Sequence, residues 1–296
     1  MRPSARRPAP PLVRAFGTGP GCTTRTPRRR VLVVHPGALP AGHYAELAAA
    51  LPPDAALHVV DLEQVPEYFQ AALRGGRAGV TVPELARQAA DALRSQGLFD
   101  RPWTLVGWSF GGVVGHALTA LLATDELPRR AVLLDSIAPV PAYTRDDEEV
   151  GADLVVPWFC MYLAAKRGGT LAAPVPGPAG PGDVDGPLTA VLGEALEHGV
   201  LRPGTTLPGL RKVYDAYVDG LLRNNRLVRG FRPAPARVPV TLLRPERGLL
   251  DTPDPLGWEQ LAGDLTVERT PGDHYTMLRD PVAVKTTAAR VLDSRT

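Results

Sequence analysis

The sequence has few cysteines and no long hydrophobic run. Its 296 residues include two cysteines, Cys22 and Cys160, which lie far apart in the chain. Small secreted folds are held together by many closely spaced cysteines, so a disulfide framework is not indicated and we expect a protein of the reducing cytoplasm. No uninterrupted apolar stretch approaches the roughly 20 residues of a membrane-spanning helix. We therefore expect no membrane partner.

The chain also has no net positive charge outside the N-terminal segment. The formal net charge is +2, and many of the arginines lie within residues 1–30. The rest of the chain is close to neutral or acidic and has no basic stripe, which argues against nucleic acid as a partner. Arg6 and Arg7 are followed by prolines, Arg14 and glycines where a secretory signal would carry its apolar core. We predict a disordered basic leader over residues 1–29, with export as the alternative.

From Arg30 onward, short apolar runs rich in β-branched residues alternate with helix-like stretches. The expected strands are 31–36, 57–62, 103–109, 131–136, 238–245 and 265–270, and the expected helices are 44–51, 82–96, 111–123 and 282–292. Alternation of this kind is typical of βαβ units, which build a mostly parallel sheet with helices on both faces. The sequence therefore predicts one domain of the α/β class over residues 30–296.

The alternation is lost between residues 137 and 236. Helical periodicity persists in 149–166, 187–197 and 210–228, while 168–187 is so rich in proline and glycine that it should be a mobile loop. An insertion of this size with helices of its own predicts a helical cap over the active edge of the sheet.

The strongest local motif is GWSFG, residues 107–111, which matches G-x-S-x-G where a strand turns into a helix. The flanking glycines permit a tight, strained turn that exposes the Ser109 hydroxyl, and the helix start offers backbone N–H groups to a developing oxyanion. The alternative is an ordinary turn of small residues. The apolar strand before the motif and the Ala/Leu-containing helix after it favour a nucleophile.

A serine nucleophile needs a base, and the chain offers six histidines. His274 lies in PGDHYTML, between the last expected strand and the last helix, where the carboxyl edge of the sheet would present it beside Ser109. His35 ends the first strand near the same edge and is expected to form a pocket wall. The others are interpreted as packed or solvated residues.

The base needs a carboxylate to orient it, and the chain pattern leaves the choice open. Asp135 ends the strand after the nucleophile helix, whereas Asp251 follows the next strand, and Asp254 is a third option. All three positions follow strand ends at the same edge of the sheet, so periodicity does not separate them.

Stabilising the oxyanion requires two backbone donors. One is expected to be the N–H of Phe110, directly after the nucleophile, and the other should come from the loop after the first strand. Gly37 and Ala38 are the candidates there, because Pro36 has no N–H.

Several of these segments together resemble the thioesterase domains that end modular polyketide and nonribosomal peptide synthetases. They are HPGALPAGHYAELAAAL, GWSFGG, VLLDS, VYDAYVDGLLRNNRLVRGFRP, VPVTLLRPE, DPLGWEQLAG and PGDHYTML. The resemblance covers most of the chain from Arg30 and implies an α/β-hydrolase fold with Asp135 as the acid. Trp108 and Phe110, on either side of the serine, are more like release thioesterases than small stand-alone editing enzymes.

The resemblance implies a serine thioesterase of polyketide or nonribosomal peptide biosynthesis, a source of antibiotics. Ser109 would accept an acyl chain from the phosphopantetheine arm of an acyl or peptidyl carrier protein, and water or an internal hydroxyl or amine would release it as an acid or a ring. No metal or bound coenzyme is implied. Two interpretations are open for a set of aromatic and sulfur side chains, which either line an apolar acyl channel or simply pack within the protein. They are Trp108, Phe110, Trp158, Phe159, Met161 and Tyr162. Alternatives are a small-molecule esterase or lipase and a catalytically silent carrier-docking scaffold.

Overall fold

A seven-stranded sheet forms the centre of the computed structural model, which describes residues 11–17, 27–172 and 184–293. The strand order is β1-β3-β2-β4-β5-β6-β7. β1 runs antiparallel to β3, and every other neighbouring pair is parallel. The strands are β1 (Val13–Phe16), β2 (Arg29–His35), β3 (Ala55–Asp61), β4 (Trp103–Trp108), β5 (Ala131–Leu134), β6 (Val240–Arg247) and β7 (Leu265–Asp273).

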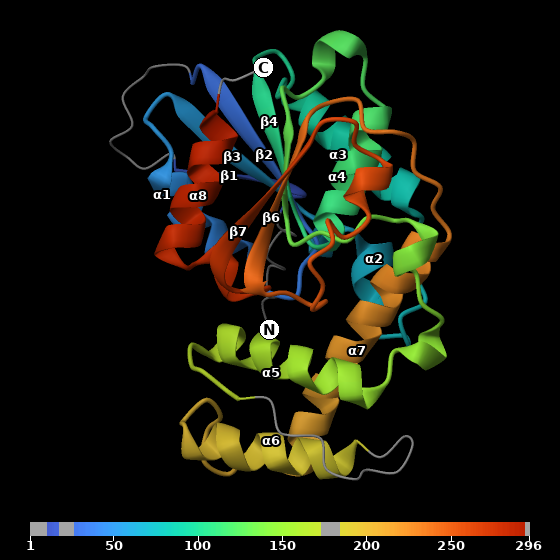
Figure 1. Cartoon of the computed structure of the whole chain (residues 1–296), viewed down its shortest axis with the longest axis vertical. Helices are drawn as coiled ribbons and strands as arrows, with labels where there is room; N and C mark the ends of the chain where they lie inside the picture. The colour runs from blue at the N-terminus through green and yellow to red at the C-terminus, as the bar shows by residue number, and fades with distance from the viewer. Residues whose placement is uncertain (1–10, 18–26, 173–183, 294–296) are drawn as a thin grey trace, which may run out of the picture.

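Helices cover both faces of this sheet (Figure 1). α1 and α8 lie on one face, and α3 and α4 lie on the other. The helices are α1 (Tyr44–Ala50), α2 (Pro66–Ala71), α3 (Val82–Ser95), α4 (Phe110–Ala120), α5 (Ala152–Arg167), α6 (Asp185–Glu197), α7 (Leu207–Arg229) and α8 (Pro281–Leu292). The predicted mostly parallel α/β architecture is confirmed, and it follows from central strands that are apolar on both faces.

α4 packs close to the sheet because its first turn contains two consecutive glycines. A β-carbon on Gly111 would lie 2.1 Å from the carbonyl oxygen of Val34 in β2. A β-carbon on Gly112 would lie 2.3 Å from the Oγ atom of Ser136, which follows β5. Only glycine fits at these positions, so the GG pair fixes the start of α4 against the carboxyl ends of its neighbouring strands.

The N-terminal segment differs from the prediction of a disordered leader over residues 1–29. Residues 13–16 form β1, which pairs with β3 and is the edge strand of the sheet, and Arg29 already belongs to β2. The prediction is wrong for these residues, because a four-residue strand between arginines and prolines carries no readable periodicity and is stabilised by its neighbour. The remaining parts of the leader, 1–10 and 18–26, lie outside the described residues.

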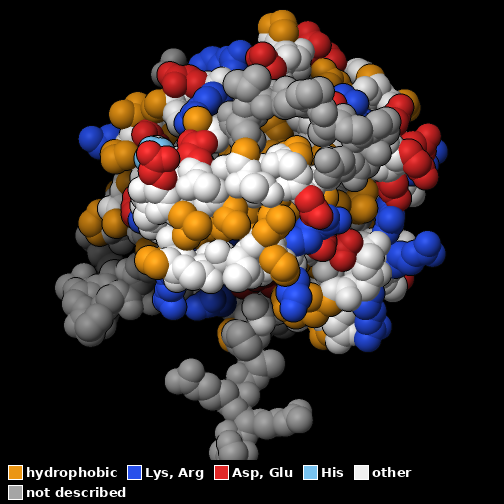
Figure 2. Space-filling model, turned by 90° about the horizontal axis from the view of Figure 1, so that it is seen from below, with side chains coloured by type: hydrophobic (Ala, Val, Ile, Leu, Met, Phe, Trp, Pro, Cys, Tyr) orange, Lys and Arg blue, Asp and Glu red, His pale blue; other side chains and the backbone are white. Residues whose placement is uncertain are grey.

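Residues 137–236 contain α5, α6 and α7, which lie together beyond one end of the sheet (Figure 1). α7 runs from this group back toward the sheet domain. α6 begins at Asp185, so the last residues of the predicted 168–187 loop are helical, while 173–183 lie outside the described residues. Figure 2 views the molecule from this end, where rows of hydrophobic side chains lie between charged ones.

Two smaller expectations concern cysteine and membranes. Cys160 is buried in α5 with a free thiol, whereas Cys22 lies outside the described residues. Over the described ranges, no helix has both the length and the apolar character needed to cross a bilayer.

Candidate active site

Ser109 lies in a strained turn between β4 and α4. Its backbone φ of 53° and ψ of −128° fall outside the regions that non-glycine residues prefer, at a cost of about 1–3 kcal/mol. The turn is held by a 2.9 Å hydrogen bond from the Ser109 N–H to the carbonyl of Leu134. A β-carbon on Gly107 would lie 2.4 Å from the Cα of Gly112, which explains the glycine before the serine. This is the geometry that G-x-S-x-G predicts for an exposed nucleophile.

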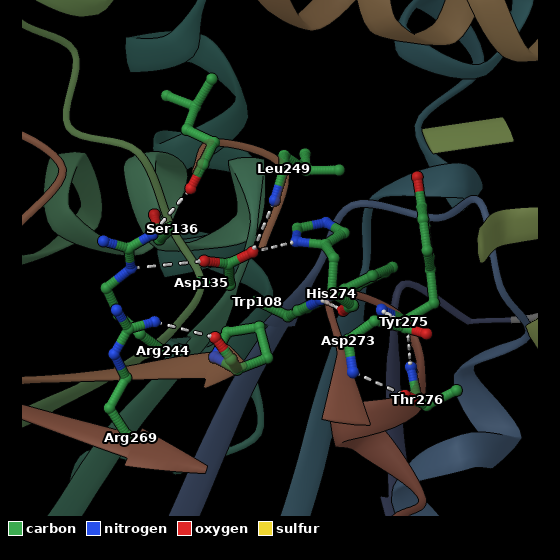
Figure 3. Close-up of polar contacts among 12 residues, drawn as sticks. Trp108, Asp135, Ser136, Arg244, Leu249, Arg269, Asp273, His274, Tyr275 and Thr276 are labelled. Carbon is green, nitrogen blue, oxygen red and sulfur yellow. Dashed lines mark hydrogen bonds and ion pairs between the residues drawn. The ribbon is translucent and has the colours of Figure 1, made fainter. Parts of the chain in front are cut away.

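His274 follows β7 and contacts Asp135, which follows β5. The two residues form a 2.7 Å hydrogen bond between Nδ1 of His274 and Oδ2 of Asp135, and both side chains are 2% exposed. Figure 3 shows the Asp135 carboxylate between His274 and Arg244. Since an ionised carboxylate only accepts, Nδ1 of His274 carries the proton and Nε2 is left as the basic nitrogen.

The imidazole of His274 is fixed by its backbone and its neighbours. The backbone N–H of His274 donates to the carbonyl of Arg247, and the backbone carbonyl of His274 accepts a 2.9 Å hydrogen bond from Nε1 of Trp108. Its ring packs against those of Trp108 and Tyr275, with centroids 5.2 and 4.8 Å apart. Trp108, directly before the nucleophile, therefore connects Ser109 with His274 from the chain's other end.

Asp135 has partners besides His274. The backbone N–H of Leu249 donates to Oδ2 at 3.3 Å, and Nε of Arg244 lies 3.9 Å from Oδ1. Arg244 is 2% exposed, and burial lowers its pKa, while the nearby Asp135 charge acts in the opposite direction. The same guanidinium donates to the carbonyls of Leu250, Thr252 and Asp254, which holds the loop after β6.

The structure brings only one of the three candidate acids to His274. Asp251 is exposed in the loop that Arg244 holds, and the carboxylate of Asp254 lies 3.5 Å from the hydroxyl of Tyr143. Asp135 is therefore the carboxylate with the geometry of a triad acid, in agreement with what the family resemblance implies.

Two cavities meet at Ser109. The larger, of about 430 Å³, is also lined by His274, by the loop after β2 and by the cap helices α5 and α7. The smaller, of about 140 Å³, is mostly apolar and lies beside α4 and the start of α5. Because cap residues line both, the cap covers the carboxyl edge of the sheet at the nucleophile.

The aromatic residues considered for an acyl channel divide into two groups. Trp108 and Tyr162 line the larger cavity, and Phe110 and Trp158 line the smaller one. Phe159 is fully buried in the hydrophobic core, and Met161 packs against that core and lines neither cavity, so these two follow the packing interpretation. The ring of Phe159 packs against those of Tyr214 and Tyr217 in α7.

The loop after β2 brings both candidate oxyanion donors to the cavity that contains Ser109. Gly37 and Ala38 have φ values of +91° and +70°, and both line the larger cavity with Ser109. The hydroxyl of Tyr68 donates to the carbonyl of Pro36 at 2.9 Å. His35 is not a pocket wall: it is fully buried, and its Nε2 lies 2.7 Å from the carbonyl of Leu39. Burial lowers the pKa of His35 to about 4, so it anchors the loop as a neutral ring.

The structure adds polar residues that the sequence pattern did not indicate. Glu63 and Arg223 line the larger cavity, and the Arg223 guanidinium lies 3.5 Å from the ring centroid of Tyr68. The hydroxyls of Tyr217 and Tyr275 form a 2.6 Å hydrogen bond above the same cavity. Glu63 comes from the segment after β3, Arg223 and Tyr217 from α7, and Tyr275 from the segment after β7, and the sequence analysis assigned none of them a role.

Residues 29–156 match the family model of the thioesterase domain. A search of curated proteins found no match.

The chain is similar to solved structures of thioesterases. A four-domain nonribosomal peptide synthetase, holo-AB3403 bound to AMP and glycine, is 24% identical with a TM-score of 0.61, over 97% of this chain but 20% of that one. The NocB thioesterase domain from the nocardicin cluster is 22% identical with a TM-score of 0.53, over 94% of this chain and 97% of that one. The RedJ thioesterase of the prodiginine pathway in Streptomyces coelicolor is 18% identical with a TM-score of 0.54, over 89% and 85%.

These similarities agree with the resemblance that the sequence motifs carry. The family match covers the strands and helices from β2 to the start of α5, including the nucleophile turn and Asp135. The chain thus has the α/β-hydrolase fold of the polyketide and nonribosomal peptide thioesterases, and its residues 29–156 match the thioesterase domain family.

Proposed function

We propose that this protein is a serine thioesterase that releases an acyl or peptidyl chain from the phosphopantetheine arm of a carrier protein. The observation that carries the proposal is the buried 2.7 Å hydrogen bond between His274 and Asp135 in a site whose cavity also contains Ser109. A base oriented by a carboxylate beside a serine in a strained turn is the arrangement that acyl transfer requires.

In the first half of the reaction, Ser109 attacks the thioester carbonyl. Nε2 of His274 takes the hydroxyl proton, and Asp135 holds the ring and stabilises the imidazolium. The oxyanion is bound by the N–H of Phe110 and by an N–H of Gly37 or Ala38. The carbon–sulfur bond then breaks, and the departing thiolate takes up the proton held by His274, which leaves the imidazole neutral.

In the second half, His274 activates a new nucleophile. Water yields a free acid, and an internal hydroxyl or amine of the acyl chain yields a ring. The proton taken from this nucleophile returns to the Ser109 oxygen when the acyl-enzyme breaks down. As proposed, neither half uses a metal or a bound coenzyme.

The carrier protein enters the proposal through the similar structures. One relative is part of a four-domain nonribosomal peptide synthetase, and another, YbtT, is a type II thioesterase of the yersiniabactin pathway. The larger cavity, open and shared between the sheet domain and the cap, would admit the arm and present its thioester to Ser109.

Labelling with a fluorophosphonate tests the nucleophile directly, since the NocB thioesterase domain forms a covalent complex with a fluorophosphonate nocardicin G analogue. We expect one adduct, located by mass spectrometry on Ser109 and lost in Ser109→Ala and His274→Ala. An unlabelled wild-type protein contradicts the proposal.

A substrate comparison separates the proposed activity from its alternatives. We expect faster turnover of a pantetheine thioester than of the matching short oxygen ester. The reverse preference identifies a small-molecule esterase, and labelling without turnover of either identifies a silent docking scaffold.

A further inference from the structure

The two cavities that meet at Ser109 differ in the side chains that line them. Charged side chains from three elements line the larger cavity, namely Glu63 after β3, Lys166 in α5 and Arg223 in α7. Among the described residues that line the smaller cavity, Arg145 carries the only charge, and its side chain is exposed. Most of the others are apolar, and they include Phe110, Val113, Ile137, Leu154 and Trp158.

The two cavities share a junction at the nucleophile. Ser109, Leu221, Asn224 and Leu249 line both of them. A thioester carbonyl within reach of Ser109 lies at this junction. Its two substituents, the acyl chain and the sulfur that carries the arm, can therefore extend into different cavities.

The position of His274 decides which substituent enters which cavity. His274 lines the larger cavity and does not line the smaller one. In acyl transfer the imidazole takes the serine proton and then gives it to the leaving group, so Nε2 must lie within hydrogen-bond reach of both. The departing sulfur therefore lies in the larger cavity, on the side of His274. The acyl chain is left with the smaller cavity.

The chemistry of the two linings agrees with this division. A phosphopantetheine arm carries amides and a phosphate, which are polar groups that the charged lining of the larger cavity can accommodate. The methylenes of an acyl chain are favoured in the apolar lining of the smaller cavity, because burial removes their surface from water.

The wall of the smaller cavity is held in place by contacts between α7 and the segment 143–150. Nδ2 of Asn225 donates to the carbonyl of Arg145 at 2.9 Å, and Nε of Arg226 donates to Oδ2 of Asp147 at 2.6 Å. The cavity is thus formed by the protein itself before any substrate binds.

The volume of the smaller cavity limits the acyl group that it can hold. The cavity measures about 140 Å³. An apolar cavity of about 150 Å³ in another protein holds one benzene molecule, so there is room here for roughly six carbon atoms. Trp158, half-buried in α5, contributes the bulkiest side chain of the lining.

We infer that the smaller cavity is the acyl-binding subsite and that Trp158 restricts it to apolar acyl groups of roughly six carbon atoms. The inference rests on the proposed thioesterase function and assigns it a substrate class. A short apolar acyl group fills the cavity, whereas the end of a longer chain remains outside it and gains nothing from it.

The test measures kcat/KM for N-acetylcysteamine thioesters of butanoic, hexanoic, octanoic and decanoic acid. Each methylene that enters the cavity should raise kcat/KM by about fourfold. We expect the wild-type value to rise by at least about tenfold from butanoyl to hexanoyl, and by less than about threefold from octanoyl to decanoyl.

Two substitutions should move this break in opposite directions. Trp158→Ala enlarges the cavity, so the step from octanoyl to decanoyl should increase to about tenfold. Val150→Phe fills the cavity, so the step from butanoyl to hexanoyl should fall below about threefold. Met161→Ala is the matched control, because Met161 is half-buried in the same helix as Trp158 and lines neither cavity. It should keep the wild-type profile.

The outcomes separate the inference from the function on which it rests. A wild-type profile without this break overturns the inference, and so does a profile that a folded variant at position 158 or 150 leaves unchanged. Both results leave the thioesterase intact. If Trp158→Ala does not fold, the wild-type break and the shift in Val150→Phe decide. Absence of turnover for every thioester overturns the proposed function, and the inference with it.

Discussion

Asp135 accepts a 2.7 Å hydrogen bond from Nδ1 of His274, although the two residues are 139 positions apart in the chain. The contact joins the carboxyl ends of β5 and β7, two strands separated in the sheet by β6. It decides which carboxylate orients the base, and the first prediction depends on it.

Asp135→Asn is expected to lower thioester turnover by about 10³–10⁴-fold, because an amide can orient the wrong tautomer of His274 and cannot stabilise the imidazolium. Asp251→Asn is the matched control and should remain within about tenfold of wild type, since Asp251 is exposed. Steady-state kinetics on a pantetheine thioester measure both. The reverse ranking would overturn the assignment of Asp135.

Arg244→Met is expected to destabilise the fold by about 3–5 kcal/mol, because it removes the cation beside Asp135 and leaves this buried carboxylate without a counter-charge. The change also releases the carbonyls of Leu250, Thr252 and Asp254. Urea unfolding measures the loss. Arg247→Met removes an arginine whose side chain is 67% exposed and should change stability by less than about 1 kcal/mol. Similar losses in the two variants would show that Arg244 does not hold this loop.

Gly111→Ala is expected to destabilise the protein by about 3 kcal/mol, because the new methyl would lie 2.1 Å from the backbone oxygen of Val34. Gly193→Ala is the control: Gly193 lies in α6 with no atom within 4 Å of the added carbon. This helix-interior glycine should gain up to about 1 kcal/mol from the change. Urea unfolding of both variants checks the contrast, and a tolerated Gly111→Ala would argue against the close packing of α4.

The free energy of unfolding is expected to fall between neutral and acidic pH, and part of this fall is due to the buried ring of His35. Its pKa is lowered from 6.5 to about 4 by burial, so the unfolded chain binds a proton before the folded protein does. The contribution of His35 to the free energy of unfolding is therefore fully present above about pH 6.5 and is lost as the pH falls toward 4. At pH 5 the loss from this residue is about 2 kcal/mol.

Urea unfolding at pH 7 and pH 5 measures this loss in the wild type and in His35→Gln, which cannot titrate. The variant should lose about 2 kcal/mol less than the wild type between the two pH values. An identical pH dependence in both proteins would show that His35 is not held neutral by the fold.

The sequence by itself determined the α/β class and the position of Ser109, because both depend on local physics. Apolar runs such as 31–36 and 131–136 have no stable environment except between two layers of helices. GWSFG encodes its own strained turn, since glycines at 107, 111 and 112 are the residues that can approach neighbouring backbone so closely.

Tertiary structure decided what depends on distance through space. Asp135 and Asp251 both follow strands at one edge of the sheet, and only the packing of Arg244 against the loop after β6 separates a buried carboxylate from an exposed one. β1 exists because β3 offers an edge to pair with. Glu63 lies against Gly37 because β3 lies beside β2, a contact between strands that no local pattern encodes.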